Sequence, residues 1–127
     1  MTKELVILAL RRAILKQPPQ KGFIHHSGRG TQYCSKAYRA LLDEYDMISS
    51  MSRKGDGYDN ACIEAFHSVI KKEWIFHEKY QTRAQAEASI LDYILHFYNC
   101  KRIIHGTIGY KTPIAYKKEE YKQKKVN

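Results

Sequence analysis

A pair of prolines divides the first part of the chain into a helix and a strand. Residues 2–17 follow the helical period loosely, and Pro18 and Pro19 end that pattern. A short apolar segment at 23–26 follows, and it breaks at the glycine-containing residues 27–30. This punctuation predicts a helix and then a short strand that presents a loop at its end. The residues expected on the buried face of the helix are Leu5, Leu8, Ala9 and Leu15.

Capping residues locate the elements that follow. Ser35 can cap a second helix, and residues 47–51 indicate a second short strand. Thr82 and Gln85 form a capping box for a helix that reaches about Tyr98. With one further helix between them, the predicted order is helix, strand, helix, strand, helix, helix.

That further helix carries Glu64. Asp59 or Asn60 can cap it, and its pattern continues to about Trp74. At about 100° per residue, Glu64 and Lys71 fall on one face, away from the apolar face. Taken alone, Glu64 is better explained as a solvated carboxylate that pairs along its own helix. The apolar face comprises Cys62, Phe66, Val69 and Ile70.

Three sequence motifs in register resemble transposases of the IS three family of insertion sequences. Residues 58–66, YDNACIEAF, resemble the signature around the family's last catalytic carboxylate, with Glu64 in that position; residues 50–55 extend the match. Residues 25–33, HHSGRGTQY, resemble the second-aspartate motif, with Gly28 where the aspartate belongs. The spacing of 35 residues between positions 28 and 64 is also the family's. Further similarity at 98–105 and 109–113 extends the resemblance over nearly the whole chain.

The resemblance implies an α/β, ribonuclease-H-like core similar to retroviral integrase. In such DDE-type polynucleotidyl transferases, two aspartates and a glutamate hold two divalent metals, usually Mg²⁺, which activate a nucleophile and stabilise the leaving oxygen during attack on a DNA phosphate. We expect two short parallel strands and about four helices, with 1–116 as a partial catalytic core and 117–127 as a basic tail. An uncovered sheet edge and exposed apolar surface should accompany so small a sheet.

Two departures from the family pattern put catalysis in doubt. Gly28 has no side chain to bind metal, and the strand with the first aspartate would lie upstream of Met1, so the core is expected to be N-terminally truncated. Only Glu64 remains as a metal ligand and catalytic residue, and we expect no activity from the chain alone. One alternative is a non-catalytic module that binds DNA or an intact transposase; another is a metal nuclease that uses a different acid. The acids in question are better explained as solvated or capping residues: Asp43, Glu44, Asp46, Asp56 and Asp59.

The formal net charge of +9 predicts a polyanionic partner, and DNA fits best. Arg53 and Lys54, in a glycine-rich loop, are candidate phosphate contacts, although a solvated loop explains them nearly as well. The resemblance implies a DNA contact for Lys71, although an exposed helical lysine without a function is an equal alternative. It implies a DNA or packing role for Arg102. Part of the charge excess lies near the C-terminus and has a solvated tail as its alternative reading. These tail lysines are Lys117, Lys118, Lys122, Lys124 and Lys125.

Several other residues have structural interpretations. His25 and His26 alternate along a strand, so one should face the core and the other the site. Tyr93 and Phe97 share a helical stripe and are expected in the core. The three cysteines suit reduced thiols packed as small apolar residues in a cytosolic protein, and no apolar run is long enough to span a bilayer. A zinc site is not expected, because no fourth ligand completes the set of His96, Cys100 and His105.

Overall fold

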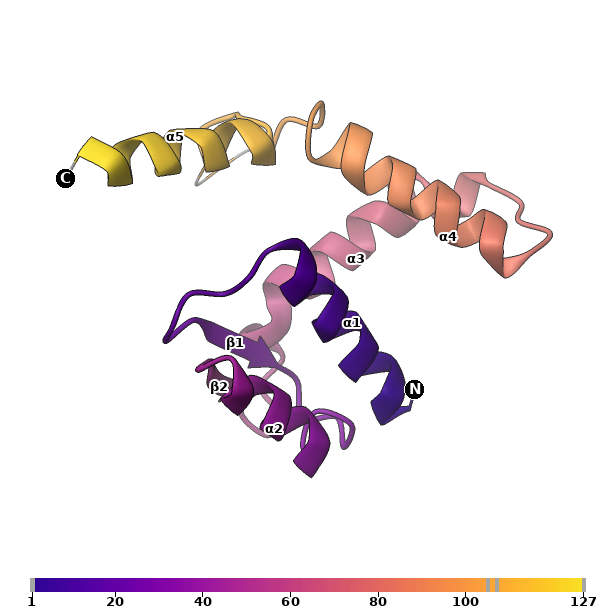
Figure 1. The fold of residues 1–127 in the computed structure, drawn as a ribbon. Coiled ribbons are helices and arrows are strands. Elements are labelled where there is room, and N and C mark those ends of the chain that lie inside the picture. The colour runs from indigo at the N-terminus through magenta and orange to yellow at the C-terminus, as the bar shows by residue number, and fades with distance from the viewer. Residues whose placement is uncertain (1, 105, 107, 127) are drawn as a thin grey trace. The chain divides into compact units, whose positions relative to one another are not determined.

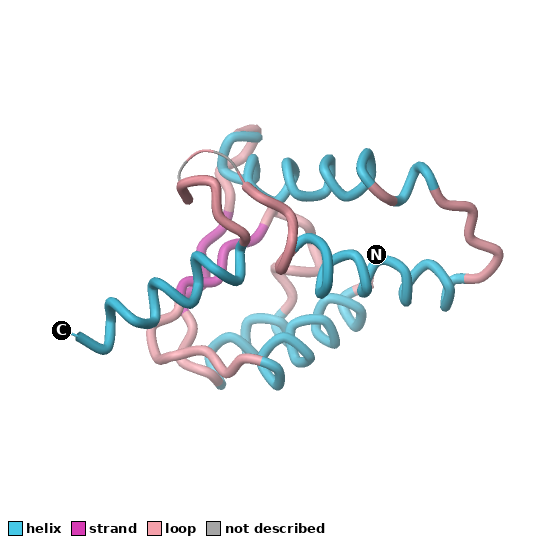
Figure 2. The backbone as a smooth tube through the Cα atoms, turned by 90° about the horizontal axis from the view of Figure 1, so that it is seen from above, coloured by secondary structure: helices cyan, strands magenta, loops and turns pink. Residues whose placement is uncertain are grey.

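The computed structural model describes residues 2–104, 106 and 108–126, which form five α-helices and two strands (Figure 1). Figure 2 shows the two short strands running side by side. None of the helices in these ranges is both long enough and apolar enough to cross a membrane. The elements are α1 Lys3–Lys16, β1 Ile24–Ser27, α2 Lys36–Glu44, β2 Ile48–Met51, η1 Gly57–Asn60, α3 Ala61–Glu73, η2 Ile75–His77, α4 Arg83–Asp92, η3 Tyr93–Tyr98 and α5 Pro113–Val126.

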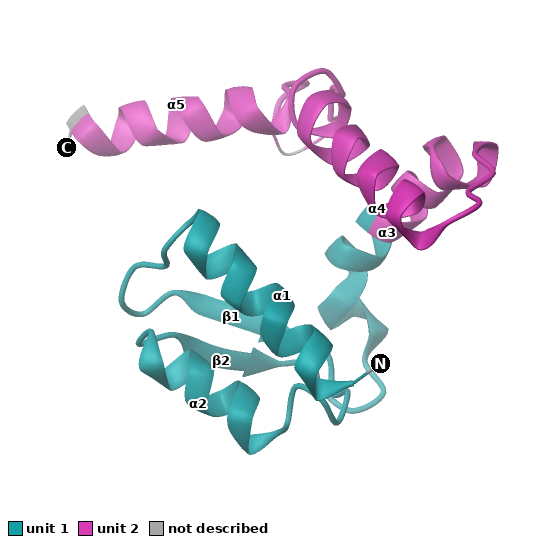
Figure 3. Cartoon of the chain, turned by 45° about the vertical axis from the view of Figure 1, so that its right-hand side comes forward, with its two compact units in different colours: residues 1–66 teal, residues 67–127 magenta. Residues whose placement is uncertain are grey.

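The chain divides into two compact units, residues 1–66 and residues 67–127 (Figure 3). The first unit contains α1, both strands, α2 and the start of α3. The second contains the rest of α3, α4 and α5. Each unit has its own buried aromatic or aliphatic centre.

Helices α1 and α2 build the core of the first unit. Ser35 caps α2 as predicted, because its hydroxyl accepts a hydrogen bond from the Tyr38 N–H at 3.3 Å. The predicted buried face of α1 was wrong: Leu5 and Leu8 are about half exposed, and Leu15 is 81% exposed. Helix α1 is apolar on most sides, so the sequence period did not single out one face. The core residues are Val6, Leu10, Ile14, Tyr38, Leu41, Leu42 and Met47.

Strands β1 and β2 form the predicted parallel pair, in which Ile24 is opposite Ile48 and Ser27 is opposite Met51. Helix α2 connects them, as a parallel pair requires a crossover. The side chains of Ile24 and Ile48 point to the same face and are 63% and 54% exposed, and the neighbouring Phe23 is 55% exposed. Among the described residues neither strand has a second neighbour, so the sheet keeps open edges and a bare apolar face.

The second unit is centred on Tyr93, whose side chain is 1% exposed. Thr82 and Gln85 form the predicted capping box at the start of α4, and the helix continues through the π-helical turn η3 to Tyr98. The rings of Trp74 and Phe97 each lie 5.4 Å from the Tyr93 ring. The core prediction for Tyr93 is therefore confirmed, whereas Phe97 packs on it from the surface and is 42% exposed.

Helix α5, Pro113–Val126, is a fifth α-helix, and it contains most of the segment that was expected to form a basic tail. Pro113 takes the first helical position, which favours proline because no N–H is needed there. The Thr112 hydroxyl accepts a hydrogen bond from the Ala115 N–H at 3.3 Å, and the Ile114 N–H donates to the Asn99 carbonyl at 3.0 Å. The predicted boundary between residues 116 and 117 thus lies inside a continuous helix.

Candidate functional site

Position 28 faces the turn that leads into the helix of Glu64. Gly28 follows β1 directly, and a Cβ atom placed on it would lie 3.2 Å from the Asn60 side-chain nitrogen. Asn60 is the last residue of η1, immediately before α3. A side chain at position 28 would therefore project toward the start of the helix that carries Glu64.

Glu64 lies in the first turn of α3, is exposed, and lines a shallow pocket with Gly57, Tyr58 and Ala61. Within the described part of the chain it has no hydrogen-bond or ion-pair partner. Of the apolar face predicted for α3, Ile70 is buried. Cys62 was assigned to that apolar face, but it is exposed.

The pocket beside Glu64 does not fit a pair of divalent metals. Two-metal chemistry needs several carboxylates around the ions, because hard cations prefer oxygen ligands and their charge must be compensated. The residues that the structure describes contain no group of three His, Cys, Asp or Glu side chains that could hold one metal ion. Gly28 contributes no ligand, and Glu64 is a single carboxylate.

The basic loop before α3 is closed by ion pairs. The Asp59 carboxylate accepts hydrogen bonds from the Arg53 backbone N–H at 2.8 Å and from the guanidinium at 3.3 Å. Asp56 pairs with the same guanidinium at 2.6 Å and accepts a hydrogen bond from the Tyr58 N–H. The bond to Arg53 lowers the pKa of Asp59, and the same contact raises the pKa of Arg53. Asp59 therefore closes the loop rather than capping α3, while Lys54 remains exposed.

The two histidines of β1 behave as the strand alternation predicted. His25 is half-buried, shares a 2.9 Å hydrogen bond with the Tyr38 hydroxyl, and has its pKa lowered first by burial and then by His26. His26 is exposed, and its ring nitrogens lie 2.9 Å from the Ser50 hydroxyl and 3.1 Å from the Ser52 hydroxyl. His26 thus connects the end of β1 to the end of β2.

Arg29 and Ser52 were not singled out from the sequence, yet they fix the loop that contains Gly28. The Arg29 Nε donates a hydrogen bond to the Ser52 carbonyl at 2.8 Å. The Ser52 N–H donates to the Ser27 carbonyl at 3.0 Å, and Ser52 is only 4% exposed. The resemblance could have drawn attention to both residues, because Arg29 lies within the motif at 25–33 and Ser52 within the match at 50–55.

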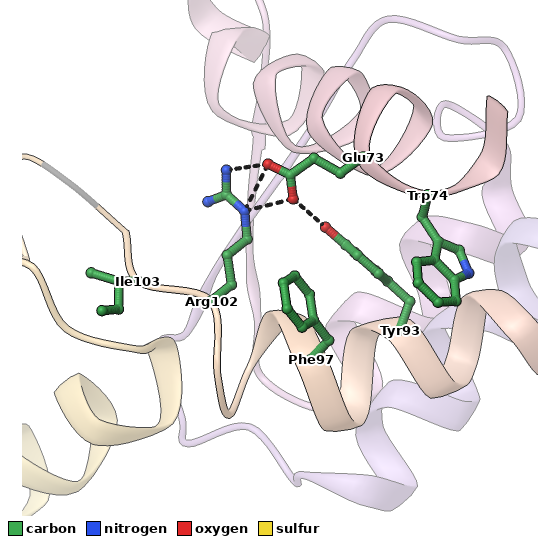
Figure 4. A pocket seen from close by; sticks show the side chains of 6 residues that line it. All are labelled: Glu73, Trp74, Tyr93, Phe97, Arg102 and Ile103. Carbon is green, nitrogen blue, oxygen red and sulfur yellow. Dashed lines mark hydrogen bonds and ion pairs between the residues drawn. The ribbon is translucent and has the colours of Figure 1, made fainter. Parts of the chain in front are cut away.

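In the second unit, Arg102 forms an ion pair with Glu73 (Figure 4). Its Nη2 and Nε donate to the two carboxylate oxygens at 2.7 Å and 2.9 Å, and the Tyr93 hydroxyl donates to the same carboxylate at 2.8 Å. Hydrogen bonding from Arg102 lowers the pKa of Glu73, whereas burial and then Glu73 raise the pKa of Tyr93 to about 12. Sequence spacing gave no sign of this pair, because 29 positions separate its members. The same cluster lines a pocket with Trp74, Phe97 and Ile103.

Glu73→Gln should lower the free energy of unfolding by about 1 to 2 kcal/mol, because it weakens charge-assisted hydrogen bonds to Arg102 and Tyr93. The contribution of the Glu73 charge should be complete above the ordinary glutamate pKa of about 4.3 and be lost as the pH falls through the lowered pKa. Urea unfolding at pH 7 and at pH 3 measures both effects. The exposed Glu78→Gln is the control, and equal losses for the two variants at pH 7 would contradict this role.

The remaining predicted site residues lie apart from any cluster. Lys71 is exposed on α3. His96 forms a 2.7 Å contact with Asp92, the Cys100 thiol donates to the Leu95 carbonyl, and His105 lies outside the described residues. The three cysteines are free, as predicted, but all are exposed rather than packed in the core.

Comparisons with known proteins agree with the motifs. Residues 1–57 and residues 64–121 each match a family described as an integrase core domain. The chain is 43% identical to the insertion element IS600 uncharacterized 31 kDa protein of Shigella sonnei, over 97% of this chain and 44% of that protein. It is 41% identical to the transposase for insertion sequence element IS904 of Lactococcus lactis, over 93% of this chain and 46% of that protein. The chain thus spans less than half the length of these relatives.

A solved structure supports the fold class. A chain from the cryoEM structure of the simian T-cell lymphotropic virus intasome, in complex with PP2A regulatory subunit B56 gamma, matches with a TM-score of 0.72. The match covers 91% of this chain and 40% of that chain at 13% sequence identity. This likeness confirms the predicted α/β, ribonuclease-H-like fold, similar to that of retroviral integrase.

Proposed function

The chain belongs to the integrase core family of insertion-sequence transposases, and from this premise we propose that it is a DNA-binding part of a transposase core that does not cut DNA by itself. Complete relatives of this kind act in DNA transposition. We assign the chain the DNA-binding part of that activity, in the cytosol, where bacterial DNA is accessible.

The observation that carries the loss of cleavage is the glycine at position 28. That position projects toward the start of α3, yet glycine offers no ligand. In complete family members, bound Mg²⁺ supplies Lewis-acid activation of the nucleophile and the phosphate. Here Glu64 stands as a single exposed carboxylate, and an unneutralised carboxylate repels a DNA phosphate. We therefore derive no catalytic step for this chain.

DNA binding is supported by the net charge of +9 and by exposed cations in both units. We propose that Lys54 and Lys71 contact phosphates, since both are exposed. Arg53 is shared between two carboxylates, so its main role is to close the loop that presents Lys54. For Arg102, the ion pair with Glu73 supports a packing role in preference to a phosphate contact.

Duplex DNA should bind weakly, without sequence preference, and with an affinity that falls steeply as salt rises, because phosphate contacts release counterions. The measurement is a fluorescence anisotropy titration of several unrelated duplexes between about 50 and 200 mM salt, a range over which about six phosphate contacts would cost about 10³ in affinity. A flat salt dependence, or a strong preference for one short sequence, would contradict the proposal.

A second function, modulation of an intact transposase, is favoured by the exposed apolar face of the sheet. Phe23, Ile24 and Ile48 are each more than half exposed, beside a strand edge without a described neighbour. Such a surface suits pairing with another protein chain or with a second copy. Slower DNA cleavage by an intact relative in the presence of this chain, reversed by Ile24→Lys, would support this function; cleavage unaffected by the chain would exclude it.

A further inference from the structure

The lysines of α5 all lie on one side of the helix. At about 100° per residue, the five lysines fall within an arc of roughly 160°, with Tyr121 near its centre. All five side chains are exposed, and Tyr121 is 51% exposed. The amine of Lys117 lies 5.8 Å from the centre of the Tyr121 ring. We call this surface the lysine face: Lys117, Lys118, Lys122, Lys124 and Lys125.

The opposite side of α5 is acidic or neutral and helps to attach the helix to its own unit. It carries Glu119, Glu120 and Gln123. Glu119 forms an ion pair with Lys111, in the segment that leads into the helix. Together with the backbone bond from Ile114 to Asn99, this contact fixes the first turns of α5 in the second unit. A merely solvated helix would need no such segregation of charge.

We propose that the lysine face of α5 binds the phosphate backbone of duplex DNA. This inference rests on the proposed function and identifies the surface that carries it. From Lys117 to Lys125 the helix rises about 12 Å, which matches about four successive phosphates at roughly 3.4 Å of axial rise per charge on one strand. The phenol of Tyr121 is placed to donate a hydrogen bond to one of these phosphates.

The composition of α5 favours DNA over an anionic membrane as the polyanion. A helix that lies in a membrane surface needs a broad apolar face opposite its cationic one. Here the side opposite the lysines contains two glutamates and a glutamine in place of such an apolar face. A helix that lies along a DNA backbone contacts the phosphates with one side, and the lysines of α5 are on one side.

The test compares two triple variants of the full chain that each remove three positive charges. The test variant is Lys118→Gln, Lys122→Gln and Lys125→Gln, three residues at spacings of four and three on the lysine face. The matched control is Lys16→Gln, Lys21→Gln and Lys36→Gln, all exposed and in the first unit. Glutamine and lysine have similar helix propensities, so circular dichroism should show equal helix content in both variants and the wild type.

The plot of log DNA affinity against log salt concentration should become less steep in the test variant, by about two to three in the magnitude of its slope. In the control the magnitude should decrease by less than about one. Each lost phosphate contact removes about 0.9 from the magnitude of the slope. Equal slopes for the two variants would overturn the assignment of DNA binding to the lysine face, while the proposal that the chain binds DNA would stand. No salt-dependent binding by the wild type would instead overturn the proposed function itself. Tighter binding to phosphatidylserine vesicles than to DNA would overturn the choice of DNA and show that the face serves a membrane.

Discussion

Leu42→Ala is expected to unfold the first unit of the chain. The Leu42 side chain is 2% exposed and packs in the buried core of that unit, together with Leu10 and Met47. Removing a buried leucine costs about 2 to 5 kcal/mol, because transfer energy is lost and a cavity remains. A unit of this size has a total stability of similar magnitude, so it cannot absorb the loss.

Amide hydrogen exchange resolved along the chain measures this effect directly. In Leu42→Ala, protection should disappear from β1 and α2 and persist around Tyr93, since Tyr93 is buried within the second unit. The control is Leu15→Ala, which makes the same substitution at a side chain that is 81% exposed and should change stability by less than about 0.5 kcal/mol. Similar protection patterns in the two variants would contradict the core assignment.

The second prediction concerns catalysis. Gly28→Asp should not give Mg²⁺-dependent cleavage, although it returns a carboxylate to the position that the family motif assigns to one. The Asn60 amide, which lies 3.2 Å from the position of the new Cβ, would have to move by a few tenths of an ångström to accommodate the side chain. Even then, the site would contain only two carboxylates, the introduced one and Glu64, whereas a pair of divalent metals requires about three. We expect the variant to match the wild type in DNA cleavage within the background of the assay.

Much of the fold followed from the sequence because its signals are local. Ser35 and the Thr82–Gln85 box act on backbone groups within one turn, so they located α2 and α4 correctly. The parallel strand pair came from the family motifs rather than from periodicity. The buried face of α1 was wrong, because a helix with apolar residues on most sides does not reveal which of them meet a neighbour.

The site could be predicted only in part, because its contacts join distant positions. The motifs drew attention to Gly28 and to the helix of Glu64. Asp59 was one of two residues expected to cap that helix, but it pairs with Arg53 instead. The pairing of Glu73 with Arg102 crosses 29 positions and depends on how α3 and the segment after η3 pack. The order of α5 depends on contacts made by Thr112 and Asn99, which composition alone does not show.

The central claim is that this family member binds DNA without cutting it, and nicking of supercoiled plasmid tests it most directly. The wild type, Gly28→Asp and Glu64→Gln would each be incubated with Mg²⁺ and with Mn²⁺, beside an intact relative as a positive control. The account predicts that the intact relative nicks the plasmid and that all three forms of this chain remain at background. Metal-dependent nicking by the wild type that disappears in Glu64→Gln would contradict it.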